Sequence, residues 1–511
     1  MGRGGAREEM WTAAWCAVAL SFPWSNSFMS VATALLGLVA LFELAQPLRR
    51  LPDSRFWRLS GLALVALVAL SGASSFWSLD GALALRDVRV KLPLAVGGLV
   101  LLAARGSALL SARSFDRVLR CAAFSAIAAS VTVVVLDLLD GPPFGGRSAS
   151  RFISHIRFGL WWAVLLPLVA ARLSRTWTLL AVAFAGLTWF WTESLSGLLS
   201  GLITMAWWGP MVLHRAGSRK EWPDSGQVRF GLAAVTGLLA CLAIGLHSAL
   251  PSDYPDLDVL PEFTENGEQY YHHPERRVTE NGHFVWTEVA WGELSAAWRS
   301  RDDRSFDEVN GRLIRFLASK GLPKDQAGVE ALSDEEVQAI AAGATSVVEW
   351  REVGWTRRWN RMCFNWGQWL DGVRSGNASL LARQVYQSTA WSAIRTLPWS
   401  AHVMGVGTGS GRGVLKKAYD MEQPNWPVSM RHRPHNQWLS LWLEQGWIGL
   451  LLLISAGWAV LCRPWGVPGI MVLWLSFCFE DTLETQAGVT LALWVLVLPA
   501  LFSSTGRAGA G

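Results

Sequence analysis

Residues 27–46 read SFMSVATALLGLVALFELAQ, an apolar run in which Glu43 is the one charged side chain. A helix needs about 20 mostly apolar residues to cross the hydrocarbon core of a bilayer. The same test, applied outward along the chain, predicts twelve membrane-spanning helices, near residues 11–24, 27–46, 59–78, 90–104, 118–138, 156–172, 176–193, 195–213, 230–250, 437–461, 467–482 and 486–503. We therefore expect an all-α polytopic membrane protein.

The overall composition agrees with a membrane location. The 511 residues are 51% hydrophobic and 17% charged, whereas soluble proteins are roughly 25% charged. Tryptophan, which favours the two faces of a bilayer, occurs 31 times against five tyrosines. Six cysteines are too few for a disulfide framework, and the apolar fraction is too high for disorder. These features exclude the cytosolic globular, disulfide-stapled and disordered classes.

The basic residues of the short loops predict the orientation of the chain. Lys and Arg are retained on the cytoplasmic side, and with the N-terminus inside they favour the inner loops by about three to one. This assignment divides the chain into residues 1–250 with nine helices, an outer segment of residues 251–434, and residues 435–511 with three helices. In a cell with two membranes the outer segment lies in the periplasm, where neither ATP nor NAD is available.

The outer segment carries opposite charges in its two halves. Residues 251–350 have 9 Lys and Arg against 20 Asp and Glu, whereas residues 351–434 have 12 against 4. The acidic half is expected to be a solvated lid or spacer, with one helix that starts at Ser333, where Glu336 completes a capping box. The basic half is rich in arginine, which suits phosphate or an anionic glycan. Attraction to acidic lipid headgroups would also explain this surplus.

A glycine repeat, Gly405-Val-Gly-Thr-Gly-Ser-Gly-Arg-Gly413, lies in the basic half. It lacks the Gly-Lys-Ser/Thr ending of a phosphate loop and matches GxGxxG in no register. We expect a tight turn that joins two helical stretches, with backbone N–H groups beside Arg412 available to a diphosphate. The pair Asp256 and Asp258 resembles a metal-binding DxD motif, but its acidic surroundings favour a solvated turn.

The sequence Arg431-His-Arg433-Pro434-His435-Asn436 precedes the tenth predicted helix. Pro434 suits the start of a helix, which would put His435 and Asn436 in the first turn. A helix N-terminus disfavours protonation of an imidazole, so a neutral His435 could accept a proton from a hydroxyl. The alternative is a histidine that only caps or orients the helix. Glu444 lies about half a turn around the helix from His435, so we expect it to pack rather than to pair with the imidazole.

Other ionisable groups lie near the outer face. Residues 378–397 predict an amphipathic helix that carries Arg383. Arg157 lies at the start of the sixth predicted helix, and an acidic run from Glu480 to Glu484 ends the eleventh. Ionisable groups at membrane depth are candidates for function, although they could instead pair with each other for structure.

Together these motifs resemble the O-antigen ligase and polymerase superfamily. The matching residues, in order, are Arg383, Gly405-x-Gly407-x-Gly409, His435-Asn436-x-x-Leu439 and Glu444-x-Gly446-x-x-Gly449. The sequence also resembles one ligase-like branch of this superfamily, at residues 154–158, 320–325 and 480–486. The resemblance covers about residues 150–486, and the first four predicted helices match in hydropathy only.

The resemblance implies a GT-C-like glycosyltransferase with an all-helical membrane fold and a large helical periplasmic loop domain. Such an enzyme is of the inverting type and resides in the bacterial inner membrane. It moves a glycan from an undecaprenyl-diphosphate carrier to a hydroxyl of a lipid or glycolipid acceptor, without metal, nucleotide or other cofactor and without nucleic acid. Within the superfamily we favour an O-antigen ligase acting on lipid A-core over an O-antigen polymerase or a protein O-oligosaccharyltransferase.

The resemblance also implies two catalytic positions. His435 matches a histidine that assists the acceptor, and Arg383 matches an arginine assigned to the diphosphate. A second arginine of the outer segment is open among Arg351, Arg357, Arg358 and Arg361, and we select Arg361. Further substrate-binding residues are expected to be Arg157, Arg412, Arg433 and Asn436.

Two other classes of protein are compatible with parts of the sequence. A transporter or flippase for the same lipid would show inverted repeats and helices broken at the midplane, but the sequence has no internal repeat and its charged groups cluster at the outer face. A membrane scaffold whose outer segment binds a partner protein would not need these arginines.

Overall fold

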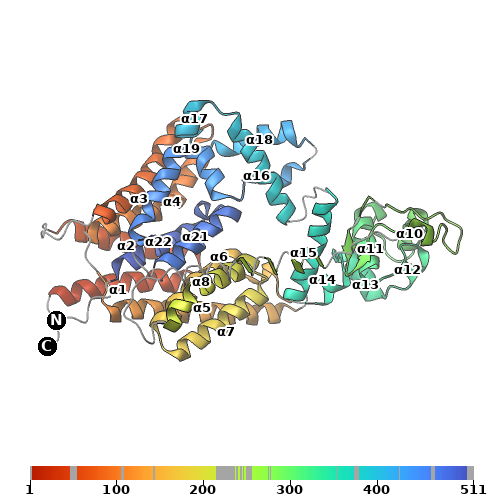
Figure 1. Ribbon diagram of the computed structural model, residues 1–511, viewed down its shortest axis with the longest axis horizontal. Coiled ribbons are helices and arrows are strands. Elements are labelled where there is room, and N and C mark those ends of the chain that lie inside the picture. The colour runs from red at the N-terminus through yellow and green to blue at the C-terminus, as the bar shows by residue number, and fades with distance from the viewer. Residues whose placement is uncertain are drawn as a thin grey trace. The chain divides into compact units, whose positions relative to one another are not determined.

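The computed structural model describes residues 3–46, 55–104, 109–141, 144–214, 236–237, 240–241, 244–245, 247–248, 256–273, 275–276, 278–352, 354–372, 379–424, 426–461 and 466–502 (Figure 1). The chain forms two compact units. The first comprises Met1–Leu136, Arg147–Val235 and Arg383–Gly511, and the second comprises Asp137–Gly146 and Thr236–Ala382. The predicted segments 1–250, 251–434 and 435–511 concern sides of a membrane, so they stay predictions.

The first unit is helical in its described residues. Its N-terminal helices are α1 (Arg3–Ser21), α2 (Asn26–Leu44), α3 (Arg55–Ser74), η1 (Ser75–Trp77), α4 (Gly81–Ala104), α5 (Ala112–Asp140, ending in the second unit), η2 (Arg147–Ala149), α6 (His155–Arg172), α7 (Arg175–Trp191) and α8 (Leu195–His214). Its C-terminal helices are α16 (Ser379–Arg395, beginning in the second unit), α17 (Trp399–Met404), α18 (Gly411–Glu422), η4 (Val428–Met430), α19 (Gln437–Ala456), α20 (Trp458–Leu461), α21 (Val467–Phe479), η5 (Thr482–Glu484), α22 (Gln486–Val497) and η6 (Leu498–Leu501).

Several of these helices suit a bilayer. In the described residues, four segments are long and apolar enough to cross one: Asn26–Leu44, Phe56–Trp77, Ala112–Asp140 and Gln437–Leu461. Shorter apolar helices are Leu195–Ala206, Val467–Phe479 and Gln486–Leu501. The chain is thus a multi-pass membrane protein. The count of twelve helices stays a prediction, and the predicted ninth helix, near 230–250, lies mostly outside the described residues.

Aromatic rings and small residues hold the first unit together. The buried rings of Trp161 in α6 and Trp494 in α22 lie with centroids 4.8 Å apart, and Phe22 stacks on Trp161 at 4.0 Å. A Cβ atom on Gly98 of α4 would come within 2.6 Å of the carbonyl oxygen of Gly61 in α3. Such close approach between small residues is typical of helix pairs in membranes.

The second unit has its own core. It contains the antiparallel strands β1 (Thr279–Glu280) and β2 (His283–Phe284), the turn η3 (Leu257–Val259) and the helices α10 (Trp291–Arg299), α11 (Phe306–Ser319), α12 (Gln326–Glu330), α13 (Asp334–Ala342), α14 (Val347–Arg351) and α15 (Trp355–Leu370). Buried Trp298, Leu313, Phe316 and Ile340 pack in one cluster. The acidic half therefore has a packed apolar core of its own, and its role as a lid or spacer stays a prediction.

Two local features bear on the sequence predictions. The capping box of Ser333 and Glu336 is present at the start of α13, as predicted. The fourth helix begins at Gly81, about nine residues earlier than predicted, because Oδ1 of Asp80 accepts a hydrogen bond from the Leu83 N–H and satisfies the first turn. Apart from the β1–β2 hairpin, the described residues agree with an all-α fold.

Candidate functional site

The glycine repeat forms the tight turn predicted from the sequence. Gly405, Gly407 and Gly409 all have positive φ angles, of 76°, 95° and 84°. The N–H of Val406 donates to the carbonyl oxygen of Leu443 at 2.9 Å, which fixes the turn against α19. The backbone of α19 is non-helical at Gly446, and this kink accommodates the turn. A Cβ atom at this position would lie 2.3 Å from the carbonyl oxygen of Val403. The turn and the kink therefore fit each other and position α18 with Arg412.

His435 lies just before α19 rather than in its first turn. Its φ angle is 48°, in the left-handed region, and the helix begins at Gln437. Asn436 is the N-cap residue, because its Oδ1 accepts a hydrogen bond from the Leu439 N–H at 3.2 Å. The prediction that Pro434 starts the helix was thus wrong by about three residues. The backbone N–H of His435 donates instead to Oδ2 of Asp481 at 3.0 Å.

Glu480 joins three of the predicted groups. Its Oε2 lies 2.9 Å from Arg157 of α6, and its Oε1 lies 2.6 Å from Arg383 of α16. Nδ1 of His435 is buried, 3.8 Å from Oε2 of the same carboxylate. The side chains of Arg157 and Glu480 are 6% and 7% exposed, whereas that of Arg383 is 24% exposed. Arg383 therefore keeps part of its side chain open to solvent.

The local charges determine the protonation states of two groups in these loops. Burial opposes ionisation of Glu480, just beyond the end of α21, but nearby His435, Arg157 and Arg383 outweigh burial and hold its pKa well below the usual range. Burial lowers the pKa of His432, and the nearby His435 and Arg412 act in the same direction. Glu480 is therefore a carboxylate and His432 a neutral imidazole at neutral pH.

A second ion network surrounds Arg433. Its guanidinium lies 2.5 Å from Asp87 of α4 and 2.5 Å from Glu484, and Nζ of Lys91 lies 2.9 Å from Glu484. Glu444 approaches Lys91 to 3.9 Å, and Asp87, Glu444 and Glu484 are close enough together to hold a metal ion. Lys91 and Arg433 supply the positive charge that a metal ion would bring, so this cluster fits an ion network better than a metal site. Glu444 packs here, as predicted.

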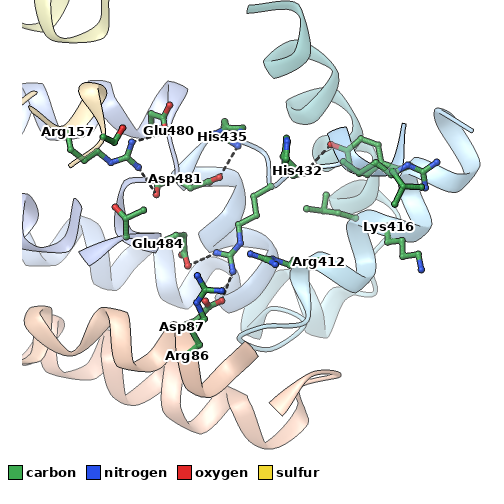
Figure 2. A pocket seen from close by; sticks show the side chains of 17 residues that line it. Arg86, Asp87, Arg157, Arg412, Lys416, His432, His435, Glu480, Asp481 and Glu484 are labelled. Atoms are coloured by element: carbon green, nitrogen blue, oxygen red, sulfur yellow. Dashed lines mark hydrogen bonds and ion pairs between the residues drawn. The ribbon is translucent and has the colours of Figure 1, made fainter. Parts of the chain in front are cut away.

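These networks line a cavity of about 590 Å³ within the first unit. Figure 2 shows Arg157 and Glu480 at one end, Arg86 and Asp87 at the other, and Asp481 and Glu484 between them. The ionisable side chains of the lining are Arg86, Asp87, Arg157, Arg412, Lys416, Tyr419, Arg431, His432, Arg433, His435, Glu480, Asp481 and Glu484.

Some cations of the lining are not neutralised. Within the part of the chain that the structure describes, Arg86, Arg412 and Lys416 form no hydrogen bond or ion pair. All three side chains are exposed. Their N–H groups are therefore available to an anion that enters the cavity.

The predicted site residues fall into three groups. His435, Arg157, Arg433 and Arg412 line one cavity, and Arg383 contacts that lining through Glu480. Asn436 is held as a helix cap, and its Nδ2 donates to the carbonyl oxygen of Cys478 at 3.4 Å.

Arg361 lies in the second unit. There its Nε donates to Oε1 of Glu349 at 3.2 Å, and it is not among the residues that line the cavity. Its assignment to the diphosphate stays a prediction.

Sequence analysis missed several members of the site. Asp87 and Arg86 were assigned to a loop because the start of α4 was placed too late. Tyr386 lies in the predicted amphipathic helix of residues 378–397 and was not predicted to belong to the site, but the centroid of its ring lies 5.5 Å from that of His435. The available signal was a pair of charges, Asp87 and Lys91, spaced by one helical turn next to an apolar run.

The comparison with protein families agrees with the motifs. Residues 328–454 match the family model described as O-antigen ligase. The match includes α16, the glycine turn and the His435 loop, and it covers about a quarter of the chain. It supports membership of the O-antigen ligase superfamily and so confirms the resemblance predicted from the sequence. No curated protein matches the chain.

Proposed function

We propose that the chain is an inverting glycosyltransferase that moves a glycan from an undecaprenyl-diphosphate carrier to a hydroxyl of lipid A-core, as an O-antigen ligase does. The observation that carries this proposal is the 590 Å³ cavity, which has His435 and a surplus of cations in its lining. Six basic residues line it, Arg86, Arg157, Arg412, Lys416, Arg431 and Arg433, against four acidic ones, Asp87, Glu480, Asp481 and Glu484. A diphosphate suits that surplus.

Fixed cations would stabilise the leaving group. When the bond between the sugar C1 and the phosphate oxygen breaks, its electron pair stays on the diphosphate, which gains negative charge. The partly exposed Arg383 and the unpaired side chains of Arg86 and Arg412 would meet this charge. Because Glu480 holds Arg383 in place, little reorganisation is needed as the charge develops.

His435 would activate the acceptor. Its Nδ1 is buried beside Glu480, which leaves Nε2 as the nitrogen available to a substrate. If Nδ1 carries the proton toward the carboxylate, Nε2 can accept the proton of the acceptor hydroxyl as its oxygen attacks C1. The neighbouring His432 is held neutral by its lowered pKa, so it adds no positive charge that would oppose protonation of His435.

The proposed topology accompanies this chemistry. The N-terminus would be cytoplasmic, residues 251–434 periplasmic, and the cavity open to the periplasmic face of the inner membrane. The carrier lipid would then present its diphosphate at the bilayer surface, where the apolar helices end.

The test is a transfer assay with the purified full-length chain, a synthetic undecaprenyl-diphosphate glycan and lipid A-core. We expect a glycolipid product, and His435→Ala should slow its formation by about 10²–10⁴-fold, the usual contribution of a general base. His402→Ala is the matched control, because His402 lies in α17 of the same unit and does not line the cavity. Absence of product with the intact chain, or equal rates for the two variants, would refute the proposal.

A further inference from the structure

The second unit contains a pocket that the proposed reaction does not use. We call it the hairpin pocket, because it lies between the β1–β2 turn, α14 and one face of α15. Its volume is about 230 Å³, and its lining consists of Thr279, Asn281, Gly282, Val348, Thr356, Trp359, Asn360 and Cys363. All eight residues are neutral, in contrast to the highly charged lining of the first unit's cavity.

The residue types explain the backbone conformation on two sides of this pocket. Asn281 and Gly282 form the two-residue connection of the hairpin, and both have positive φ angles, of 50° and 83°. Asn-Gly is the preferred pair for such a turn. On the other side, Thr356, Trp359, Asn360 and Cys363 recur at helical spacing, which gathers them on one face of α15.

An aromatic ring and several polar groups are left available in the pocket. The side chain of Trp359 is 38% exposed, although tryptophan side chains are usually more deeply buried. The amide groups of Asn281 and Asn360 are anchored, because their Nδ2 atoms donate to Ser319 at 3.0 Å and to Glu280 at 2.6 Å.

Four side-chain oxygen atoms in the lining are available to a ligand. Among the described residues, neither Oδ1 of Asn281 and Asn360 nor the hydroxyls of Thr279 and Thr356 have a partner. Burial raises the pKa of the Cys363 thiol to about 11, so this side chain stays neutral as well. The pocket thus offers an apolar ring, fixed acceptors and rotatable hydroxyls, and no charge.

We propose that the hairpin pocket binds one neutral sugar ring of a glycan. The C–H face of a pyranose can pack on the indole of Trp359, while its hydroxyls exchange hydrogen bonds with the amide oxygens and threonine hydroxyls. The volume is below the roughly 300–1,000 Å³ of sites for drug-sized ligands, which suits a single ring. A carboxylate or phosphate would find no cation here. This inference rests on the proposed function, since the ring would belong to the donor glycan or to the acceptor glycan.

The test measures binding of free sugars to the full-length chain in a detergent without a sugar headgroup. Saturation-transfer difference NMR would be recorded with glucose, galactose, mannose, rhamnose and N-acetylglucosamine, and with glucuronate as the charged probe. We expect at least one neutral sugar to bind and glucuronate to bind at least about tenfold more weakly. Trp359→Ala should weaken the binding of that sugar by about tenfold or more.

Matched variants keep the test decisive. Trp369→Ala changes a similarly exposed tryptophan on α15 that does not line the pocket, and we expect sugar binding to be unchanged. Thr356→Val preserves the side-chain shape and removes one hydroxyl, so it should weaken binding even if Trp359→Ala fails to fold. Binding of no neutral sugar, or binding that is equal in the intact chain and in both pocket variants, would overturn the inference.

The result can be separated from that of the transfer assay. His435→Ala should slow transfer strongly but retain sugar binding, so sugar binding remains measurable even if no transfer is detected. Where transfer is observed, a raised KM for the lipid-linked donor in Trp359→Ala identifies the ring as part of the donor glycan. A raised KM for lipid A-core identifies it as part of the acceptor. An unchanged KM for both substrates counts against a glycan role for the pocket.

Discussion

The two compact units each contain a cluster of arginine and glutamate, but the charges balance in only one of the two clusters. In the second unit, the guanidinium of Arg315 lies 2.7 Å from Glu280, and Nε of Arg361 lies 3.2 Å from Glu349. Two cations thus meet two carboxylates, and none of the four lines the hairpin pocket. The cluster joins α11, α14, α15 and β1 and therefore has a structural role.

In the first unit the charges around the cavity do not balance. Arg157 and Arg383 share Glu480, and further cations of the lining have no partner among the described residues. The difference teaches that an arginine beside a glutamate is by itself compatible with a purely structural role. A cavity with unpaired cations beside the pair is what indicates binding. Removing charge should therefore reduce transfer in the first unit and stability in the second.

Among the changes that remove charge, the largest effect is expected for Arg383→Ala. It removes a partly exposed arginine that would meet the departing diphosphate, so transfer should slow by about 10²–10³-fold, as when a preorganised donor is lost from an active site. The measurement is kcat in the transfer assay, with accumulation of the lipid-linked donor in cells as a second readout. Arg383→Lys is the control, because it keeps the charge but loses the planar fork, and it should recover only part of the rate. Full activity of the alanine variant would contradict the role of Arg383.

A smaller effect on transfer is expected for Arg412→Ala. This change removes one unpaired cation of the cavity without breaking an ion pair, so KM for the donor should rise by about tenfold, which corresponds to about 1.4 kcal/mol. Lys417→Ala is the matched control, since Lys417 is an exposed cation on the same helix that does not line the cavity. Equal KM values for the two variants would show that Arg412 does not bind the donor.

The sequence predicted much of this site, but not which cations are free. His435, Arg157, Arg433 and Arg412 were selected from motifs, and the structure brings all four to one cavity. Which guanidinium meets a carboxylate depends on how distant helices approach each other, and no local pattern encodes that approach. The pairing of Arg433 with Asp87, 346 positions away along the chain, is of this kind.

The fold shows the same limit. Long apolar runs and the glycine turn could be recognised locally, because hydropathy and backbone conformation are local properties. The kink at Gly446 could not be recognised locally, because it depends on the close approach of the backbone of residues 403–405, which are distant in the sequence. The start of α4 was misplaced because its first turns are charged, and two of those charges, on Asp87 and Lys91, are paired with residues of α19, η5 and the loop before α19.

Arg361→Leu should affect stability rather than transfer. Burial opposes ionisation of Glu349, but the charges of Arg361 and Arg315 outweigh burial and keep its pKa below the ordinary value of 4.5. A carboxyl group whose pKa is lower in the folded than in the unfolded state stabilises the folded state at pH values above its unfolded pKa. This stabilisation is lost as the pH falls through the folded pKa. Without Arg361 that pKa moves upward, so acid unfolding should begin at a higher pH.

The measurement for Arg361→Leu is the melting temperature of the purified chain as a function of pH, with the transfer rate measured in parallel. We expect a lower melting temperature and a rate within about twofold of the intact chain, because neither Arg361 nor Glu349 lines the cavity of the first unit. If transfer is lost while the melting temperature is unchanged, Arg361 is the second diphosphate arginine that the sequence suggested, and the contrast between the two clusters fails.

The smallest effect is expected at Asn436, where the sequence predicted substrate binding and the structure has a helix cap. Asn436→Ala removes the acceptor for the Leu439 N–H, which should cost about 1 kcal/mol of stability. Asn436→Ser keeps a good capping oxygen, so the melting temperature of this variant should stay near that of the intact chain. If Asn436 acts only as a helix cap, both variants should retain transfer. If both variants instead lose transfer to the same extent, the carboxamide touches substrate, because serine restores the cap but cannot restore the amide.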